Sequence, residues 1–273
     1  MPEHFEVRRM ADYLIDHGLV GQRLVDHGFM NQGERILKTP ALDWHQLRGQ
    51  RLNQIRVKAK TTGFEFDTIT VVLHYRFTGI PHLEGIPYNN RLHTIFSLPI
   101  STQQPQHCRF FWEFDQLKMN FFDTRCLSHM RLVKGVPFDD IDAINSLPPD
   151  IGALANITLH DWRSHTKGST VVLKDWLLNQ ATWPSGIGNY LACEILAYSG
   201  LFPLIRLNDL TDQQWRRLYN GTQAVIQHVT KTPRYDWFKV FNRSHCLTCG
   251  GVVTKVRHKA AAQTTHFCSN CQN

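Results

Sequence analysis

The sequence predicts an α+β protein of more than one domain, with a β-rich N-terminal part, a helical middle part and a small cysteine-bearing C-terminal part. Between residues 55 and 130, β-branched and aromatic residues recur with a period of two and are interrupted by Gly, Pro and Asn turns. From residue 159 to residue 229, apolar residues recur instead at helical spacing. The last twenty-eight residues contain two Cys-x-x-Cys pairs, Cys246–Cys249 and Cys268–Cys271, with eighteen residues between them.

The composition is that of an ordinary globular protein. At 273 residues and 42% hydrophobic content, the chain is long enough for two domains and a smaller third one. No apolar run is long enough to span a membrane, and the segment from Met1 to Arg9 lacks the basic and apolar runs of a signal peptide, so we expect a cytoplasmic protein with no membrane partner. Cys108, Cys126 and Cys193 are scattered singly, which is typical of reduced thiols that fill a core.

The first predicted element is a helix over residues 7–15. Val7, Met10 and Leu14 lie at helical spacing, and Gly18 follows as a natural C-terminal stop. Three runs of strand-like alternation come next, and they favour a β-sandwich or a barrel. These runs are Thr68 to Phe77, Arg91 to Leu98 and Cys108 to Phe122.

A linker separates the β-rich part from the helical part. Residues 145–152 include Pro148 and Pro149, which favour an irregular connection. Within the helical tract, Thr211 and Gln214 have the spacing of a capping box, in which their side chains bond the amides of the first turn. We therefore expect domains at 1–145, 150–235 and 238–273.

The cysteine pairs predict one structural Zn²⁺, because two Cys-x-x-Cys motifs at this spacing are typical of a four-thiolate zinc ribbon. The surrounding tail is basic. From residue 231 to the end of the chain, seven Lys or Arg face one acid, Asp236. Zinc on four thiolates contributes about −2, so a charge of roughly +4 remains. Such a cluster of charge is most simply interpreted as a solvated face. Together with a ribbon, however, the charge favours nucleic-acid binding.

The N-terminus offers an unusual nucleophile. Methionine before Pro2 is normally trimmed, which would leave the secondary amine of Pro2 free beside Glu3. An α-amino group has a pKa near 8, so an appreciable fraction is unprotonated at neutral pH. Attack on an aldehyde-level carbon would give an iminium ion, and Glu3 could move the accompanying protons. Many proteins begin Met-Pro without using the amine, so the motif alone decides nothing.

A basic stripe follows on residues 55–60. As a strand, this segment would place Arg56, Lys58 and Lys60 on one face. Such a stripe can clamp phosphates, but an edge strand guarded against aggregation explains it equally well and is the interpretation that we favour from the stripe alone.

A glycine turn, residues 186–189, precedes the apolar helical run Tyr190 to Tyr198. Backbone amides at a helix N-terminus bind phosphate by geometry and dipole. The alternative is a plain connection between two helices, and both remain open at this point.

Taken together, these segments resemble the formamidopyrimidine-DNA glycosylase and endonuclease VIII family of bifunctional DNA repair enzymes. The resemblance runs in register along nearly the whole chain. It comprises the opening Pro2-Glu3-His4-Phe5-Glu6-Val7, the pair Ala59-Lys60, His74-Tyr75-Arg76-Phe77-Thr78-Gly79, Asp123-Thr124-Arg125, Leu177-Leu178-Asn179-Gln180 with Gly186-Ile187-Gly188-Asn189, and the ribbon ending in Cys271-Gln272.

The resemblance implies a fold and a reaction. The fold is an N-terminal two-sheet β-sandwich with flanking helices, a helix-two-turn-helix domain and a four-cysteine zinc ribbon. The reaction is excision of a damaged base, followed by β,δ-elimination at the abasic site. Pro2 would attack the sugar C1′, Glu3 would protonate the opening sugar, and Lys60 would grip phosphates and assist elimination.

The resemblance also implies that the protein is a monomer associated with the nucleoid. Its partner would be damaged or abasic DNA. Phe77 and Arg125 would fill the hole left when the lesion nucleotide is flipped out of the duplex. Arg91, Lys174 and Asn189 would contact the DNA backbone.

Some positions depart from the family pattern. Gln263 stands where the family's ribbon presents an arginine to the phosphate beside the lesion, and losing such a charge-assisted bond costs on the order of 1.5 to 3 kcal/mol. Arg257 or Lys259 would compensate in a different hairpin register. Cys126 and Leu127 replace the family's Arg-Phe, which removes an aromatic wedge.

These departures keep two further hypotheses open. One is a catalytically impaired member that binds abasic or distorted DNA without base excision. The other is a zinc ribbon protein that binds RNA.

Overall fold

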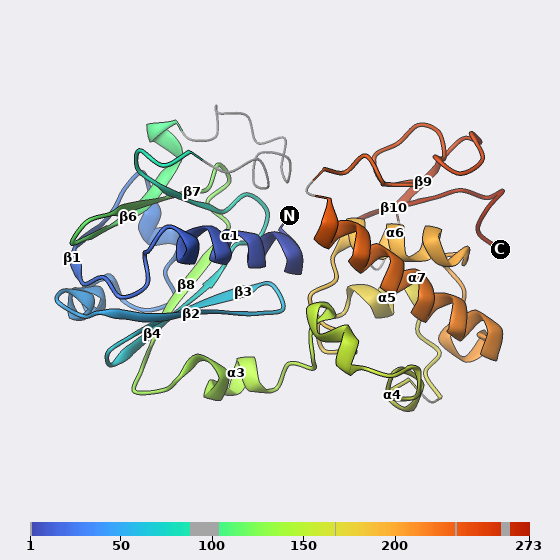
Figure 1. Ribbon diagram of the computed structural model, residues 1–273, viewed down its shortest axis with the longest axis horizontal. Helices are drawn as coiled ribbons and strands as arrows, with labels where there is room; N and C mark the ends of the chain where they lie inside the picture. Colours follow the sequence, from blue (N-terminus) through green and yellow to red (C-terminus); the bar gives the residue numbers. More distant parts are fainter. Residues whose placement is uncertain (1, 88–103, 167, 233, 258–262) are drawn as a thin grey trace. The chain divides into compact units, whose positions relative to one another are not determined.

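The computed structural model describes residues 2–87, 104–166, 168–232, 234–257 and 263–273. The chain forms two compact units, Met1–Ser146 and Leu147–Asn273, and each is a separate body with its own core (Figure 1). Arg91 and the strand predicted from it to Leu98 lie outside the described residues.

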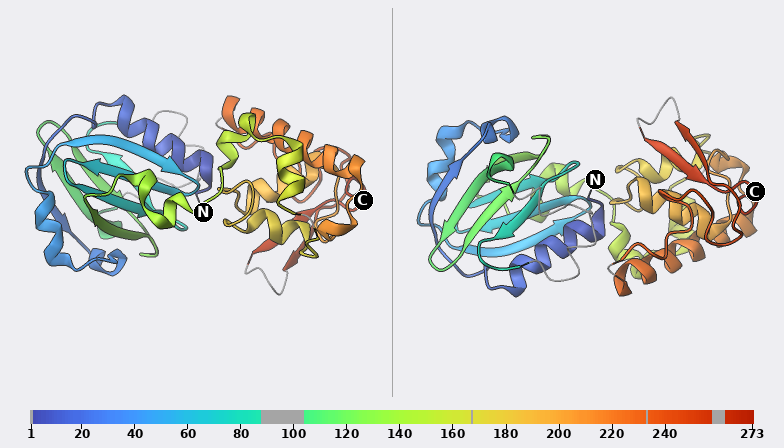
Figure 2. Two further views of the ribbon diagram at one scale, coloured as in Figure 1. Left: turned by 90° about the horizontal axis from the view of Figure 1, so that it is seen from below. Right: turned by 90° about the horizontal axis from the view of Figure 1, so that it is seen from above.

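The first unit is built on two antiparallel four-stranded sheets. Their strand orders are β1-β6-β7-β5 and β2-β3-β4-β8, and the sheets lie face to face in the views of Figures 1 and 2. The strands are β1 (Leu24–Phe29), β2 (Leu52–Lys58), β3 (Thr61–Phe66), β4 (Ile69–His74), β5 (Ile80–Leu83), β6 (Cys108–Phe114), β7 (Lys118–Phe122) and β8 (His129–Lys134).

Aromatic side chains fill the space between the sheets. Trp112 of β6 meets Phe64 and Phe66 of β3 edge to face, at centroid distances of 5.1 and 5.6 Å. Aromatic pairs in this geometry add about 0.5–1.5 kcal/mol each to the gain from burial alone. The period of two in the sequence therefore reflects a true sandwich, since one set of alternating residues in each sheet faces this core.

Helix α1 (His4–Asp16) packs against both sheets, since it contacts β2 and β3 of one and β5 of the other. Its buried face includes Val7, Met10 and Leu14, as the helical spacing predicted. The helix ends where Gly18 takes a φ of +78°, so the predicted stop is confirmed.

Two strand predictions need refinement. The run from Thr68 to Phe77 forms a strand only as far as His74, because the backbone turns at Arg76 with a φ of +55°. The run from Cys108 to Phe122 is a hairpin of β6 and β7 rather than one strand. Residues 115–117, which connect the two strands, contain no Gly or Pro, so the turn carried no strong sequence signal.

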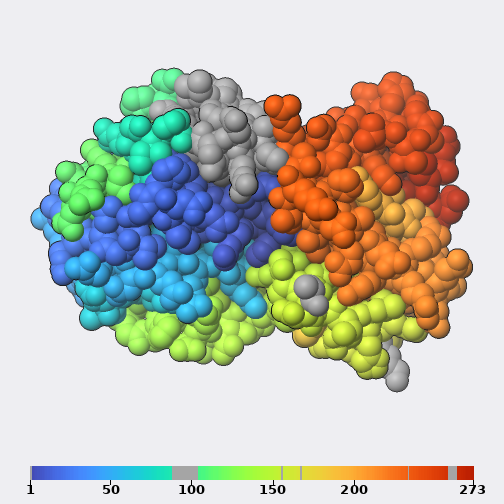
Figure 3. Space-filling view, in the orientation of Figure 1, coloured from blue at the N-terminus to red at the C-terminus, as the bar shows by residue number. Residues whose placement is uncertain are grey.

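The second unit is helical. Its helices are α4 (Leu159–Ser164), α5 (Leu173–Leu178), α6 (Asn189–Ser199) and α7 (Asp212–Lys231), and α3 (Asp142–Asn145) precedes the unit. Helix α7 packs against the nearly fully buried α6, and part of α7 lies at the surface (orange in Figure 3). Among the described residues, no helix is both long and apolar enough to cross a membrane. Short 3₁₀ turns occur at Gly33–Ile36, Ala41–Leu47, Pro105–His107, Phe138–Asp140, Ile151–Asn156 and Leu207–Asp209.

A two-stranded hairpin ends the chain. Strands β9 (Thr254–Arg257) and β10 (Thr264–Phe267) are antiparallel, and the two cysteine pairs flank them. The segment that enters this ribbon is held by Glu194 of α6, a fully buried residue whose carboxylate accepts hydrogen bonds from the amides of residues 239, 240 and 241. Burial raises the pKa of Glu194, although these hydrogen bonds oppose the shift. The predicted fold class is confirmed.

The capping box at the start of α7 is confirmed and predicts a local stability effect. The Thr211 amide donates to Gln214 Oε1 at 2.9 Å, and the Gln214 amide donates to Thr211 Oγ1 at 3.3 Å. Thr211→Ala removes one acceptor and should cost about 1 kcal/mol, whereas Thr211→Ser keeps the hydroxyl and should cost little. Hydrogen-exchange mass spectrometry of the first turn of α7 measures this, and equal exchange in the two variants would contradict it.

Candidate functional site

The first turn of α1 brings two carboxylates to the turn between β2 and β3. Pro2 and Glu3 are buried at the start of this helix, and the Glu3 amide donates to Glu6 Oε2 at 2.8 Å. The ring of His4 donates from Nδ1 to the carbonyl of Ala59 at 3.1 Å, which ties the helix to the turn that carries Lys60. An α-amine at Pro2, an acid and a lysine would thus share one small region of the first unit.

Lys60 is a buried lysine, only 6% exposed. Burial lowers its pKa from 10.5 to about 8, while the charges of Glu3 and Glu6 act in the opposite direction. The carboxylates stabilise the ammonium, so Lys60 keeps its positive charge at neutral pH. Because the side chain is buried, water screens this charge only weakly.

The predicted strand face with three cations is wrong. Strand β2 ends at Lys58, and Ala59 adopts a φ of +52° that turns the next residue inward. Arg56 pairs with Glu65 and Asp139 at the surface instead, at 3.6 and 3.1 Å. β2 is an edge strand of its sheet, as the aggregation-guard interpretation required.

His74 is a neighbour of Lys60 that the sequence analysis did not single out as a site residue. It is the last residue of β4, and Thr61 pairs with it across the sheet. Burial, together with the charges of Arg76, Lys60 and His129, lowers its pKa to about 4. His74 is therefore neutral at physiological pH in the free protein. The signal available was its place in the His74 to Gly79 motif, three residues before Phe77.

Phe77 and Arg125 lie close together on two neighbouring loops. The Arg125 guanidinium lies 4.8 Å from the centroid of the Phe77 ring, which is 39% exposed. The loop carrying Arg125 is organised by Asp123, a fully buried residue whose carboxylate accepts the amides of Arg125, Leu127 and Ser128. Burial would raise the pKa of Asp123, but these hydrogen bonds and one from Thr78 hold it below its usual range.

Lys174 lies inside the second unit. Its side chain is 2% exposed, and its Nζ donates to the Asn189 carbonyl and to Cys193 Sγ, both at 3.0 Å. Cys193 Sγ also accepts the amide of His266 in β10 at 3.4 Å. Lys174 thereby joins α5 and α6 to the ribbon hairpin, and contact of its ammonium with a phosphate stays a prediction.

Asn189 joins the start of α6 to the ribbon strand that follows Gln263. Asn189 Nδ2 donates to the carbonyl of Thr264, the residue after Gln263, at 2.9 Å. The side-chain oxygens Asn189 Oδ1 and Gln263 Oε1 are buried without a hydrogen-bond partner among the described residues. In the hairpin register, exposed Arg257 pairs with Thr264, while Lys259 lies outside the described residues.

The glycine turn before α6 is closed by Gln180. Gln180 Oε1 accepts the amide of Gly186 at 3.0 Å, and its Nε2 donates to the carbonyl of Ile187 at 2.9 Å. The apolar run begins as predicted, since α6 starts at Asn189 with Gly188 as its N-cap. One amide of the turn is therefore used to connect α5 to α6, and the connector interpretation explains this part of the motif.

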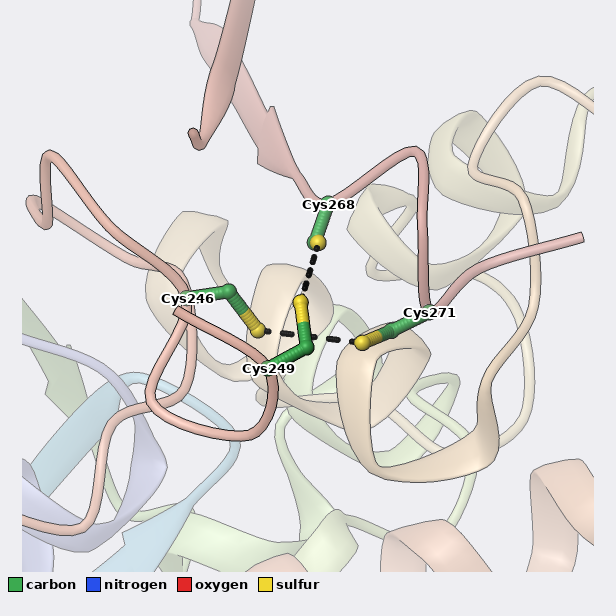
Figure 4. Close-up of side chains that lie close together, drawn as sticks. All are labelled: Cys246, Cys249, Cys268 and Cys271. Carbon is green, nitrogen blue, oxygen red and sulfur yellow. Dashed lines mark hydrogen bonds between the residues drawn. The ribbon is translucent and has the colours of Figure 1, made fainter. Parts of the chain in front are cut away.

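The four cysteines converge on one point (Figure 4). All four sulfurs of Cys246, Cys249, Cys268 and Cys271 lie within 4.8 Å of one another, and two of the pairs are 3.5 and 3.9 Å apart. A tetrahedral site with metal–sulfur bonds of about 2.3 Å needs sulfur pairs about 3.8 Å apart. The amides of Thr248 and Gly251 donate to Cys246 and Cys249 Sγ at 3.4 Å, which stabilises thiolates. The cluster fits one metal ion.

The sequence and the architecture are both similar to those of known proteins. Residues 1–130 match the family model for the formamidopyrimidine-DNA glycosylase N-terminal domain. Along its whole length, the chain is 25% identical to the formamidopyrimidine-DNA glycosylase of Listeria monocytogenes over 293 aligned positions, which cover all of both chains. The first 130 residues thus match the N-terminal domain of this glycosylase family, and the whole chain is similar to one of its glycosylases.

Two further comparisons agree with this similarity. An endonuclease 8-like 3 protein of Xenopus laevis is 34% identical over 111 residues, or 39% of this chain and 18% of that protein. The fold matches that of the Lactococcus lactis formamidopyrimidine-DNA glycosylase, solved non-covalently bound to DNA containing an AP site, with a TM-score of 0.82 and 20% identity over 99% of each chain.

The buried charge at Lys60 predicts how stability depends on pH. Its pKa of about 8 lies below the value near 10.5 expected after unfolding. Between these values the unfolded chain binds more protons, so the free energy of unfolding should rise with pH across this window, by on the order of 2–3 kcal/mol. Lys60→Met should remove the rise. Denaturant unfolding from pH 7 to pH 10 measures it, with partly exposed Lys58→Met as the matched control. A rise retained in Lys60→Met would contradict the assignment.

Proposed function

We propose that this protein excises damaged bases from DNA and then cleaves the abasic site through a Schiff base on Pro2. The observation that carries the proposal is the grouping of buried Pro2, Glu3 and Lys60 at the first turn of α1. The match of residues 1–130 to the N-terminal domain model and the full-length similarity to a formamidopyrimidine-DNA glycosylase support it. A secondary amine, an acid and a buried cation together suit an anionic substrate with an aldehyde-level carbon.

The chemistry follows from these groups. After removal of Met1, the Pro2 nitrogen bonds to the sugar C1′ while the C1′–base bond breaks and the ring oxygen takes a proton from Glu3. The resulting iminium acidifies C2′, and loss of that proton expels the 3′ phosphate. A second elimination expels the 5′ phosphate, and hydrolysis of the iminium ion returns the amine of Pro2. The charge of Lys60 favours both departures, because phosphate leaves as an anion.

We infer that Phe77 and Arg125 occupy the space that a flipped nucleotide vacates. The exposed ring and its stacked guanidinium offer an apolar wedge and a cation at adjacent points. In the second unit, Asn189 holds the ribbon strand beside Gln263 and is proposed to contact the DNA backbone along with Lys174 and Arg91. Gln263 supplies no charge at that place, so we propose a weaker ribbon contact than an arginine would give.

We propose that one Zn²⁺ holds the ribbon through Cys246, Cys249, Cys268 and Cys271. The sulfur spacing and the amide donors fit a structural four-thiolate site. Because the ribbon is short and its strands have four residues each, the metal would supply much of its folding free energy. The ion would then position the hairpin and take no part in bond breaking.

Metal removal should separate these roles. We expect one zinc per chain by elemental mass spectrometry, and loss of both zinc and abasic-DNA binding in Cys249→Ser. Cys126→Ser, which changes a partly exposed cysteine outside the cluster, is the control and should keep both. If chelated, metal-free protein binds abasic duplex as tightly as the untreated protein does, the positioning role is wrong.

Borohydride trapping tests the reaction itself. Abasic and oxidised-base duplexes incubated with the protein and sodium borohydride should give a covalent adduct, because the reductant converts the imine to a stable amine. Peptide mapping should place the DNA on Pro2. Protein that retains Met1 is the matched control, since its Pro2 nitrogen is an amide with no nucleophilic lone pair, and it should give no adduct at this position.

The same assay separates the alternatives. Tight, salt-dependent binding of abasic duplex without any adduct, and with an indifferent Pro2→Gly substitution, would favour the catalytically impaired DNA-binding protein that Gln263 suggests. Preference for single-stranded RNA over abasic duplex in competition would favour the RNA-binding hypothesis. An adduct that maps away from Pro2 would sink the proposed nucleophile.

A further inference from the structure

Arg76 adopts a backbone conformation that an arginine does not prefer. Its φ is +55°, in the left-handed region, where a Cβ crowds the backbone at a cost of about 1–2 kcal/mol. Glycine would occupy this position without that cost. Arg76 is also exposed, so its side chain fills no space in the core. Strain of this kind at an exposed residue points to a function for the side chain.

The loop that carries Arg76 is held rigidly on both sides. The buried Tyr75 hydroxyl donates to Thr62 Oγ1 at 3.0 Å, and the Tyr75 carbonyl accepts a hydrogen bond from Ser128 Oγ at 3.0 Å. A Cβ on Gly79 would lie 2.6 Å from Ser128 Oγ and 2.7 Å from the ring of Phe121. The backbone on either side of Arg76 is therefore closely packed, while residues 76 and 77 themselves are exposed.

The surroundings of Arg76 are positive or neutral. Its charge lowers the pKa values of both His74 and His129, and Arg125 lies over the ring of the next residue, Phe77. In the described part of the chain, no carboxylate is within ion-pair distance of Arg76. An unpaired cation among other cations is unfavourable in the free protein, and a bound anion would relieve the repulsion.

We propose that Arg76 is a further DNA-binding residue, which holds a backbone phosphate of the strand beside the step that Phe77 enters. This inference rests on the proposed function. The loop places the Arg76 cation one residue before the exposed Phe77 ring. Arg76 would then position the phosphate while the Phe77 ring occupies the base stack. A nucleic-acid backbone provides an anion of the required kind next to every base.

The test uses a duplex with a tetrahydrofuran abasic analogue, which lacks the C1′ oxygen and cannot form an imine. Arg76→Gly removes the charge and also the strained Cβ. We expect about tenfold weaker binding at low salt and a slope of log K against log salt reduced by about 0.9, with a thermal midpoint equal to or above that of the unaltered protein. Arg76→Lys should recover most of the slope.

Two variants serve as matched controls. Gln32→Gly relieves a φ of +68° at another exposed residue and should leave binding unchanged. Lys134→Gln removes an exposed charge at the far end of the β4–β8 pair, five residues along the strand from His129, and should also leave the slope unchanged.

If the unaltered protein binds the analogue but Arg76→Gly keeps its affinity and slope, Arg76 does not hold a phosphate and this inference alone is wrong. If the unaltered protein shows no preference for the analogue over undamaged duplex, the proposed function fails as well. A lowered thermal midpoint in Arg76→Gly would show that the residue serves the fold.

Discussion

The burial of Lys60 beside two carboxylates is the constraint on which the first unit's site depends. A lone buried ammonium is costly, so Glu3 and Glu6 must stay close to it, and both belong to the first turn of α1. The same requirement explains why the His4 ring bonds the carbonyl of Ala59. Fixing the lysine therefore fixes the start of the chain, where a nucleophilic amine has to be held still.

Other buried carboxylates organise loops in the same way. Asp123 gathers three amides of the loop that carries Arg125, and Glu194 gathers three amides of the segment that enters the ribbon. A carboxylate that accepts several backbone hydrogen bonds replaces the water lost on burial and specifies one loop conformation. Asp123 is hidden, whereas Arg125, the residue that its loop carries, is exposed. A buried acid can thus fix the position of an exposed side chain that is not itself packed in a core.

The order of elements could be predicted because periodicity and capping are local properties. Helix α1, the start of α6 and the capping box of Thr211 all follow from spacing within a few residues. The buried positions of Lys60 and Lys174 could not be predicted, since burial of a long cationic side chain depends on partners far along the chain. The turn at Ala59 gave no signal either, because alanine has no special preference for positive φ.

The distribution of charge in this chain differs from the pattern that the resemblance implies. Gln263 brings no charge to the ribbon, and Leu127 is smaller than an aromatic residue, yet the loop before β5 carries the cation of Arg76. The strain at Arg76 is local, and Tyr75 and Gly79 hold the loop around it. A phosphate bound at this loop would lie beside Phe77, in the same unit as Lys60 and Pro2. Affinity would then depend less on the ribbon and more on the unit that carries the chemistry.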